Sequence, residues 1–205
     1  AALAARVDPL RAATPPLRPL ANEHKETILI TVVDRDRMAV SLIYSVFNDF
    51  GGCLASEKFG INFNNRAAGF TLAEGHPNEA AGSKRPMHTI IPALLRKDSE
   101  TVMAFGVMGG GYQPQGHARV MSNVLDYGMD VQAAIDAARL SWRAGEVAVE
   151  RGYAPEVPIA LEAKGHVTAC PEVPLGGAQA VWIDRRRGLV SGGSDPRKDG
   201  LALGY

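Results

Sequence analysis

A threonine at the start of an apolar strand is the residue of this sequence with the most direct use in chemistry. Thr27 follows the polar run 22–26 and heads the β-branched segment 28–33. A hydroxyl is a weak nucleophile until a base takes its proton, and a free α-amine with a pKa of about 8 can be that base. A cut between Glu26 and Thr27 would hold hydroxyl and amine together at the first position of a rigid strand. An ordinary strand start fits the same residues.

Three further stretches carry groups that could serve such a nucleophile. The glycine-rich stretch 106–111 lies between a predicted strand and a predicted helix, where its backbone N–H groups could hold an oxyanion. The polar stretches 64–66 and 84–89 stand at strand ends and could line a pocket for an anionic substrate. A plain turn explains each of the three as well. The glycines lack the GxGxxG spacing and the P-loop lysine, so no nucleotide site is predicted.

The composition limits the classes of partner. The chain has 205 residues, 46% of them hydrophobic and 21% charged, with a formal net charge of zero. Such a chain has no basic field to hold nucleic acid or an anionic membrane, and neither partner is expected. The five histidines and two cysteines show no metal-ligand spacing, so no metal or other cofactor is expected. No signal peptide or spanning run is recognised, so we expect a cytoplasmic location and leave a periplasmic or secreted one open.

Strands flank a block of helices in the predicted order. Before Thr27 the chain has a short helical pattern, a proline-rich extended run and a polar linker. Strands are expected at 28–33, 39–47, 89–95, 101–107, 178–184 and 188–192, helices at 116–127, 131–140 and 158–164, and a long loop at 67–85. This order predicts an α+β fold with antiparallel sheets in layers.

Five spaced motifs together resemble one family, the small subunit of the γ-glutamyltranspeptidases. They occur in the order expected for that subunit, from about Thr27 to Tyr205. The motifs are Thr27 with Thr31 to Asp36, Gly60-Ile61 with Asn64-Asn65, Lys84-Arg85-Pro86, Gly109-Gly110, and Ser194-Asp195-Pro196-Arg197 through Gly204-Tyr205. Residues 105–117 are similar to the transpeptidase-like branch that includes oxamate amidohydrolase.

The resemblance implies an N-terminal-nucleophile hydrolase, an αββα sandwich made as a zymogen that cleaves itself before a threonine. Residues 1–26 would be the end of the large-subunit region with the cleavage linker, and 27–205 the small catalytic subunit. Its partner would be the large subunit of the same precursor, and the αβ unit could form a higher homo-oligomer. The carried-over catalytic residues are Thr27 as nucleophile, freed from Glu26 to become its own base, Ser45 as assisting hydroxyl, and Gly109 and Gly110 as oxyanion hole.

The departures from the family concern the substrate. Where transpeptidases carry an acidic residue for the glutamyl amino group, this sequence has Gly69. Loss of a carboxylate that pairs with an ammonium should cost on the order of a few kcal/mol of recognition. Arg66 and Phe47 stand in place of a glutamine and an asparagine, and His88 and Thr89 in place of paired serines.

Arg66 and His88 favour a substrate with acceptors or an anion, and Thr89 and Asn65 complete the expected substrate-binding set. We therefore predict hydrolysis of a small amide that bears a carboxylate, such as oxamate, through an acyl-enzyme. The alternatives are γ-glutamyl hydrolysis or transfer on glutathione-like substrates, and a processing-silent structural subunit that only packs against a partner.

Overall fold

The computed structural model describes residues 4–12, 25–143 and 145–205. They fall into two units. The larger unit comprises the described residues within Glu23–Ile135 and Gly176–Tyr205, and the smaller unit those within Ala1–Asn22 and Asp136–Leu175. The proline-rich run and most of the polar linker expected before Thr27 lie outside the described residues. The division into subunit regions at 26/27 stays a prediction.

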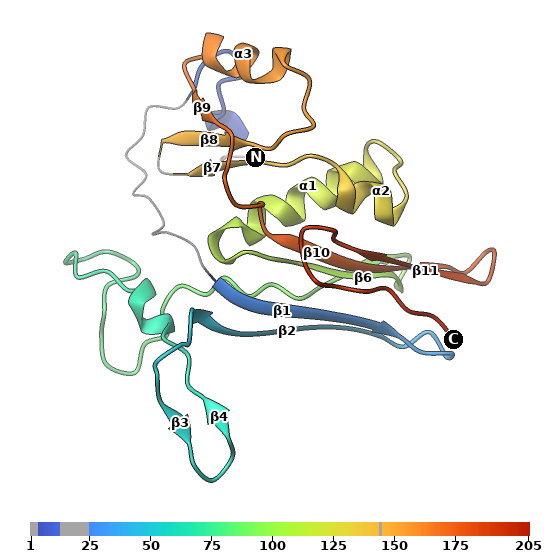
Figure 1. Ribbon diagram of the computed structural model, residues 1–205, viewed down its shortest axis with the longest axis horizontal. Coiled ribbons are helices and arrows are strands. Elements are labelled where there is room, and N and C mark those ends of the chain that lie inside the picture. Colours follow the sequence, from blue (N-terminus) through green and yellow to red (C-terminus); the bar gives the residue numbers. More distant parts are fainter. Residues whose placement is uncertain (1–3, 13–24, 144) are drawn as a thin grey trace. The chain divides into compact units, whose positions relative to one another are not determined.

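Two antiparallel sheets lie face to face in the larger unit (Figure 1). In one, β1 (Lys25–Val33) pairs with β2 (Ala39–Asn48). The other has the strand order β11-β10-β6-β5, with bounds Leu189–Ser194, Gly177–Asp184, Glu100–Met108 and Ala93–Lys97. Leu29 of β1, Ile43 of β2 and Met108 of β6 form a buried apolar cluster. The two sheets therefore share a core.

Helices cover the opposite face of the four-stranded sheet. α1 (Gln113–Leu125) lies over β6, with the His117 and Phe105 ring centroids 5.0 Å apart. Successive residues of β6 point to opposite faces of the sheet, and both faces are buried. Gly106 lies against Leu29 of the other sheet, while Phe105 faces α1. The short α2 (Val131–Asp136) follows. The architecture is α+β in layers, as the element order predicted.

Two predicted boundaries are each wrong by four residues. The helix expected over 131–140 ends at Asp136, and β7 begins at Leu140, because the Arg139 N–H donates to the Glu150 carboxylate (3.0 Å) and no longer to the helix. The strand expected from Thr89 begins only at Ala93. The residues expected to begin this strand do not pair with a neighbouring strand, because the Ile91 N–H donates to the Gln113 side chain at the start of α1 (3.1 Å).

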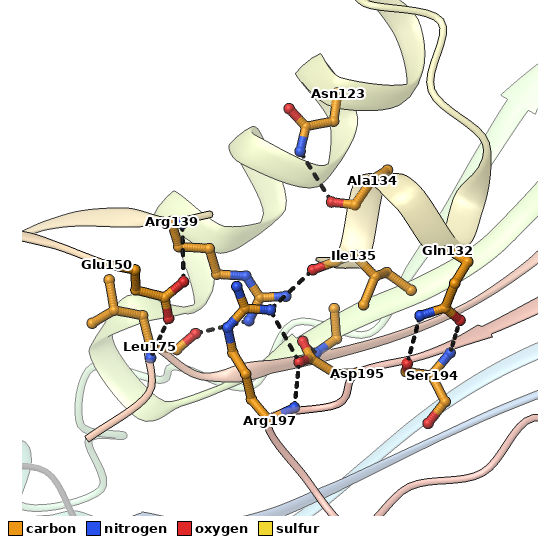
Figure 2. A network of polar contacts seen from close by, with 11 residues as sticks. Asn123, Gln132, Ala134, Ile135, Arg139, Glu150, Leu175, Ser194, Asp195 and Arg197 are labelled. Carbon is orange, nitrogen blue, oxygen red and sulfur yellow. Dashed lines mark hydrogen bonds and ion pairs between the residues drawn. The ribbon is translucent and has the colours of Figure 1, made fainter. Parts of the chain in front are cut away.

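The smaller unit contains a sheet that the sequence pattern did not predict. β7 (Leu140–Arg143), β8 (Glu146–Val149) and β9 (Val167–Ala169) are too short for a clear alternation. α3 (Glu156–Ala163) and the 3-10 turn η1 (Ala4–Arg6) complete the unit. The Glu150 carboxylate accepts hydrogen bonds from the backbone N–H groups of both Arg139 and Leu175 (Figure 2), which ties the start of this sheet to the end of the unit.

The closing motif Ser194–Arg197 holds the larger unit together. The Asp195 carboxylate is 1% exposed and accepts bonds from the backbone N–H groups of Ala178 (2.7 Å) and Arg197 (3.0 Å). The Arg197 guanidinium pairs with the same carboxylate and donates to the Ile135 carbonyl, and Gln132 bonds the backbone of Ser194 in both directions (Figure 2). This closing motif thus joins α2 to the edge of the sheet.

The loop expected over 67–85 contains little regular structure. It opens with the 3-10 turn η2 (Arg66–Gly69), after the short hairpin of β3 (Ala55–Ser56) and β4 (Ile61–Asn62). A single bridge joins Thr71 to Glu79. No helix within the described residues has the length and apolarity needed to cross a membrane, and those residues hold no cluster of metal-ligating side chains.

Candidate active site

Thr27 lies directly opposite Ser45 in the β1–β2 ladder. Its Oγ1 is 3.0 Å from the Ser45 Oγ, within hydrogen-bond distance. Because side chains two residues apart in a strand share a face, Thr27 and Ser45 lie on the face of buried Leu29 and Ile43. The two hydroxyls therefore stand at the edge of the core between the sheets, partly shielded from water.

Strand β1 extends across the bond expected to be cut. β1 begins at Lys25, earlier than predicted, because Lys25 and Glu26 pair with Asn48 and Phe47 at the end of β2. While the Glu26–Thr27 bond is intact, the Thr27 nitrogen is an amide and cannot act as a base. Cleavage before Thr27 stays a prediction.

Arg66 is the charged group of this site. It is 5% exposed, and its guanidinium donates to the Thr89 Oγ1 (3.1 Å) and to the Ser45 Oγ (3.3 Å). It also lies 4.7 Å from the centroid of the Phe47 ring, a cation–π distance. Burial holds the pKa of Arg66 below its ordinary value. Among the described residues no carboxylate forms an ion pair with it.

Neighbouring polar residues position Arg66. Asn65 bonds both the N–H (3.0 Å) and the carbonyl (3.2 Å) of Asn48, which fastens η2 to the end of β2. The Arg66 N–H donates to the Asn64 side chain (3.0 Å). The Asn65 amide is thus engaged with the backbone, and its substrate-binding role stays a prediction.

His88 and Thr89 reach the site from the next segment. Thr89 is buried and accepts the Arg66 hydrogen bond, whereas His88 is exposed and its Nδ1 accepts the Ile90 N–H (3.2 Å). Partial burial, and then the charges of Arg66 and Arg85, lower the pKa of His88. A lowered pKa favours the neutral imidazole, and the substrate-binding role of His88 stays a prediction.

The glycine loop begins one residue beyond the shared core. Met108 packs with Leu29, and Gly109 (φ 117°) and Gly110 (φ 52°) follow in left-handed conformations before α1. A Cβ at Gly109 would lie 2.8 Å from the Cα of Gly176. The loop has room only for glycine there, which suits a backbone that must approach a reacting carbonyl closely. Its oxyanion-hole role stays a prediction.

Replacing Gly109 with alanine should lower turnover by roughly 10²-fold, the effect of losing one oxyanion donor, because the added methyl group displaces the loop against Gly176. Gly128→Ala is the matched control, since Gly128 is also left-handed (φ 66°) but a Cβ there meets nothing within 4 Å. Initial rates of the two variants measure this. Equal activity would remove the loop from the mechanism.

The conformation and contacts of Phe47 could not be predicted from the sequence. It has a φ of 82°, its N–H donates to the Ser45 Oγ (3.0 Å), and its ring lies under Arg66. The sequence showed only that an aromatic residue stands where the family has an amide. No local signal predicts a left-handed aromatic residue inside a strand.

Comparisons with known proteins show the family to which the chain belongs. The family model described as gamma-glutamyltranspeptidase matches residues 1–205. The chain is 35% identical over 188 residues to the glutathione hydrolase-like YwrD proenzyme of Bacillus subtilis, covering 87% of this chain and 36% of the relative. It is 34% identical over 191 residues to the oxamate amidohydrolase proenzyme of Klebsiella pneumoniae, covering 88% of this chain and 36% of the relative.

A solved structure carries the same fold. The cephalosporin acylase from Bacillus halodurans superposes with a TM-score of 0.74 at 37% identity, over 82% of this chain and 32% of that one. The chain therefore spans about a third of the length of these relatives.

Proposed function

We propose, since the chain belongs to the γ-glutamyltranspeptidase family, that it carries the catalytic threonine of a self-cleaving amidohydrolase. The observation that carries the proposal is the distance of 3.0 Å between the hydroxyls of Thr27 and Ser45. Thr27 directly follows the peptide bond that the proposal expects to be cut. Two of the relatives are named as proenzymes, which is consistent with a chain that must be cut before it acts.

The first reaction is self-cleavage. The Thr27 Oγ1 attacks the Glu26 carbonyl carbon, the C–N bond breaks, and the hydroxyl proton ends on the freed nitrogen. The product is an ester between Glu26 and the Thr27 side chain. Water then splits this ester, which gives a Glu26 carboxylate, restores the hydroxyl and leaves Thr27 with a free α-amine.

The second reaction is turnover. The amine, with an ordinary pKa near 8, is partly neutral at pH 7 and takes the proton of the Thr27 hydroxyl as that oxygen attacks the substrate amide. The Ser45 hydroxyl orients the nucleophile, and the N–H groups of Gly109 and Gly110 face the developing oxyanion. Ammonia or an amine leaves with the proton, and water releases the acid from the acyl-enzyme.

The substrate class follows from the charge of the site. A buried guanidinium with no ion-paired carboxylate among the described residues is matched by a substrate carboxylate, which can accept two parallel hydrogen bonds. Gly69 offers no acidic group for a substrate ammonium. We therefore propose a small amide with a carboxylate and no amino group, of which oxamate is the simplest. The 34% identity to an oxamate amidohydrolase proenzyme supports this choice.

A γ-glutamyl substrate is the second candidate, favoured by the 35% identity to a glutathione hydrolase-like proenzyme. An amide panel on the matured protein separates the two. We expect ammonia release from oxamate at a higher kcat/KM than amine release from a γ-glutamyl anilide. The reverse order would replace the first substrate class by the second.

We further propose that the partner is the large subunit of the same precursor, and that it covers the outer face of β1 and β2. Six apolar side chains on that face are 47–59% exposed, an unusual density for one sheet surface. They are Ile28, Ile30, Val32, Val40, Leu42 and Tyr44. A two-stranded ribbon open on one face needs such a cover, and the relatives are about three times as long as this chain.

Leu42→Glu should therefore abolish co-purification of the two subunits, because it puts a charge at the centre of this face, opposite Ile30. Leu72→Glu is the control, since Leu72 is 91% exposed on a loop. Size-exclusion chromatography of the co-expressed subunits measures the result. Normal assembly of the Leu42 variant would place the partner on another surface.

A further inference from the structure

The β1–β2 ladder is interrupted at one place, opposite the bond that the proposed function requires to be cut. From Thr27 to Val33, each residue of β1 has its partner on β2 in continuous register. Thr27 pairs with Ser45 and Glu26 with Phe47, so Val46 has no partner on β1, and its carbonyl accepts the Asn65 N–H (3.2 Å) instead. This is a β-bulge, which bends the strand and disrupts the ladder locally.

Phe47 maintains the bulge in an unusual conformation. Its φ of 82° is in the left-handed region, which a bulky L residue rarely adopts. Such a residue persists only where its surroundings hold it, and such residues cluster at functional sites.

Contacts with Ser45 and Arg66 hold Phe47 there. Its N–H donates to the Ser45 Oγ (3.0 Å), and the Arg66 guanidinium lies over its ring at 4.7 Å. Arg66 is itself fixed by the hydroxyls of Thr89 (3.1 Å) and Ser45 (3.3 Å). The strained residue is therefore tied to the hydroxyl that neighbours the nucleophile.

We propose that Phe47 is a positioning residue for self-cleavage, and this inference rests on the proposed function. A peptide bonded to its neighbour strand on both sides has a fixed carbonyl orientation. Attack by the Thr27 Oγ1 on the Glu26 carbonyl carbon closes a five-membered ring over one face of this peptide, so the peptide plane must be able to turn. The left-handed backbone of Phe47 keeps the ladder broken at this point, so the Glu26–Thr27 peptide can turn.

Two substitutions separate the effect of the Phe47 backbone conformation from the effect of its ring. Phe47→Gly and Phe47→Val both remove the ring and its contact with Arg66, but only glycine adopts a φ of 82° freely. In the full precursor, followed by intact mass, the glycine variant should cleave at least about tenfold faster than the valine variant. A smaller ratio overturns the inference. Phe47→Asn and Phe47→Thr form a second pair with the same logic, should the valine variant not fold.

Hydroxylamine tests which step is affected, because it splits esters and leaves amides intact. If Phe47 acts before the ester forms, hydroxylamine should not restore the rate of Phe47→Val. Restoration would overturn the inference.

Asp49→Val is the matched control for strain. Asp49 is also left-handed (φ 44°) but lies beyond Asn48, the last paired residue of β2. The Asp49→Val variant should have a lower melting temperature but should cleave itself at the normal rate. A wild-type precursor that stays uncut would contradict the proposed function itself. A precursor that cuts normally, with equal glycine and valine rates, would contradict only the role of Phe47.

Discussion

Replacing Thr27 with alanine should leave the precursor uncut and should lower amide turnover by roughly 10³-fold or more, because one oxygen is the nucleophile of both reactions. Thr27→Ser keeps a hydroxyl at the same place and should retain both reactions at a reduced rate. Intact mass reports the cut, and ammonia release reports turnover.

Thr31→Ala is the control for that substitution. Thr31 lies on the same face of the same strand and pairs with Ser41, outside the constellation of Thr27, Ser45 and Arg66. Its variant should cleave and turn over normally. A cleaved and active Thr27→Ala protein would end the proposed mechanism.

Replacing Arg66 with glutamine should raise the KM for oxamate by roughly tenfold to a hundredfold, since hydrogen bonds to charged groups contribute about 1.5–3 kcal/mol. The neutral analogue oxamide serves as the second substrate, because it has the same size and no carboxylate. Its kcat/KM should change much less. Steady-state kinetics on the matured variant gives both values.

The pair of substrates separates recognition from structure. Arg66 also supports Ser45 and Thr89, so a general disturbance of the site would weaken oxamate and oxamide equally. Equal losses would contradict a carboxylate site at Arg66. Arg186→Gln is the control, because Arg186 is exposed in the turn between β10 and β11 and should leave the preference for oxamate unchanged.

The sequence predicted the parts of the fold that have long, regular patterns. β1, β2, β6, β10 and α1 have enough apolar residues at one period to be recognised. β7, β8 and β9 have three or four residues each and were missed. The end of α2 was misplaced because Glu150, a residue distant in sequence, binds the N–H of Arg139.

The site was predicted mainly by resemblance. The position of Thr27 suggested a nucleophile, but its pairing with Ser45 depends on strand register, which residue types alone do not determine. Arg66 was expected to bind an anion, and the structure adds that it is buried and lacks a carboxylate partner among the described residues. The φ of Phe47 was beyond prediction, because contacts with Ser45 and Arg66 produce it.

The most direct test of the account is the N-terminal sequence and intact mass of the catalytically active protein. We predict a small fragment that begins Thr27-Ile28-Leu29, with ammonia release from oxamate rising in step with the fraction of chain cut before Thr27. Full turnover by protein in which the Glu26–Thr27 bond is intact would contradict the account, because an amide nitrogen cannot act as the base of the nucleophile.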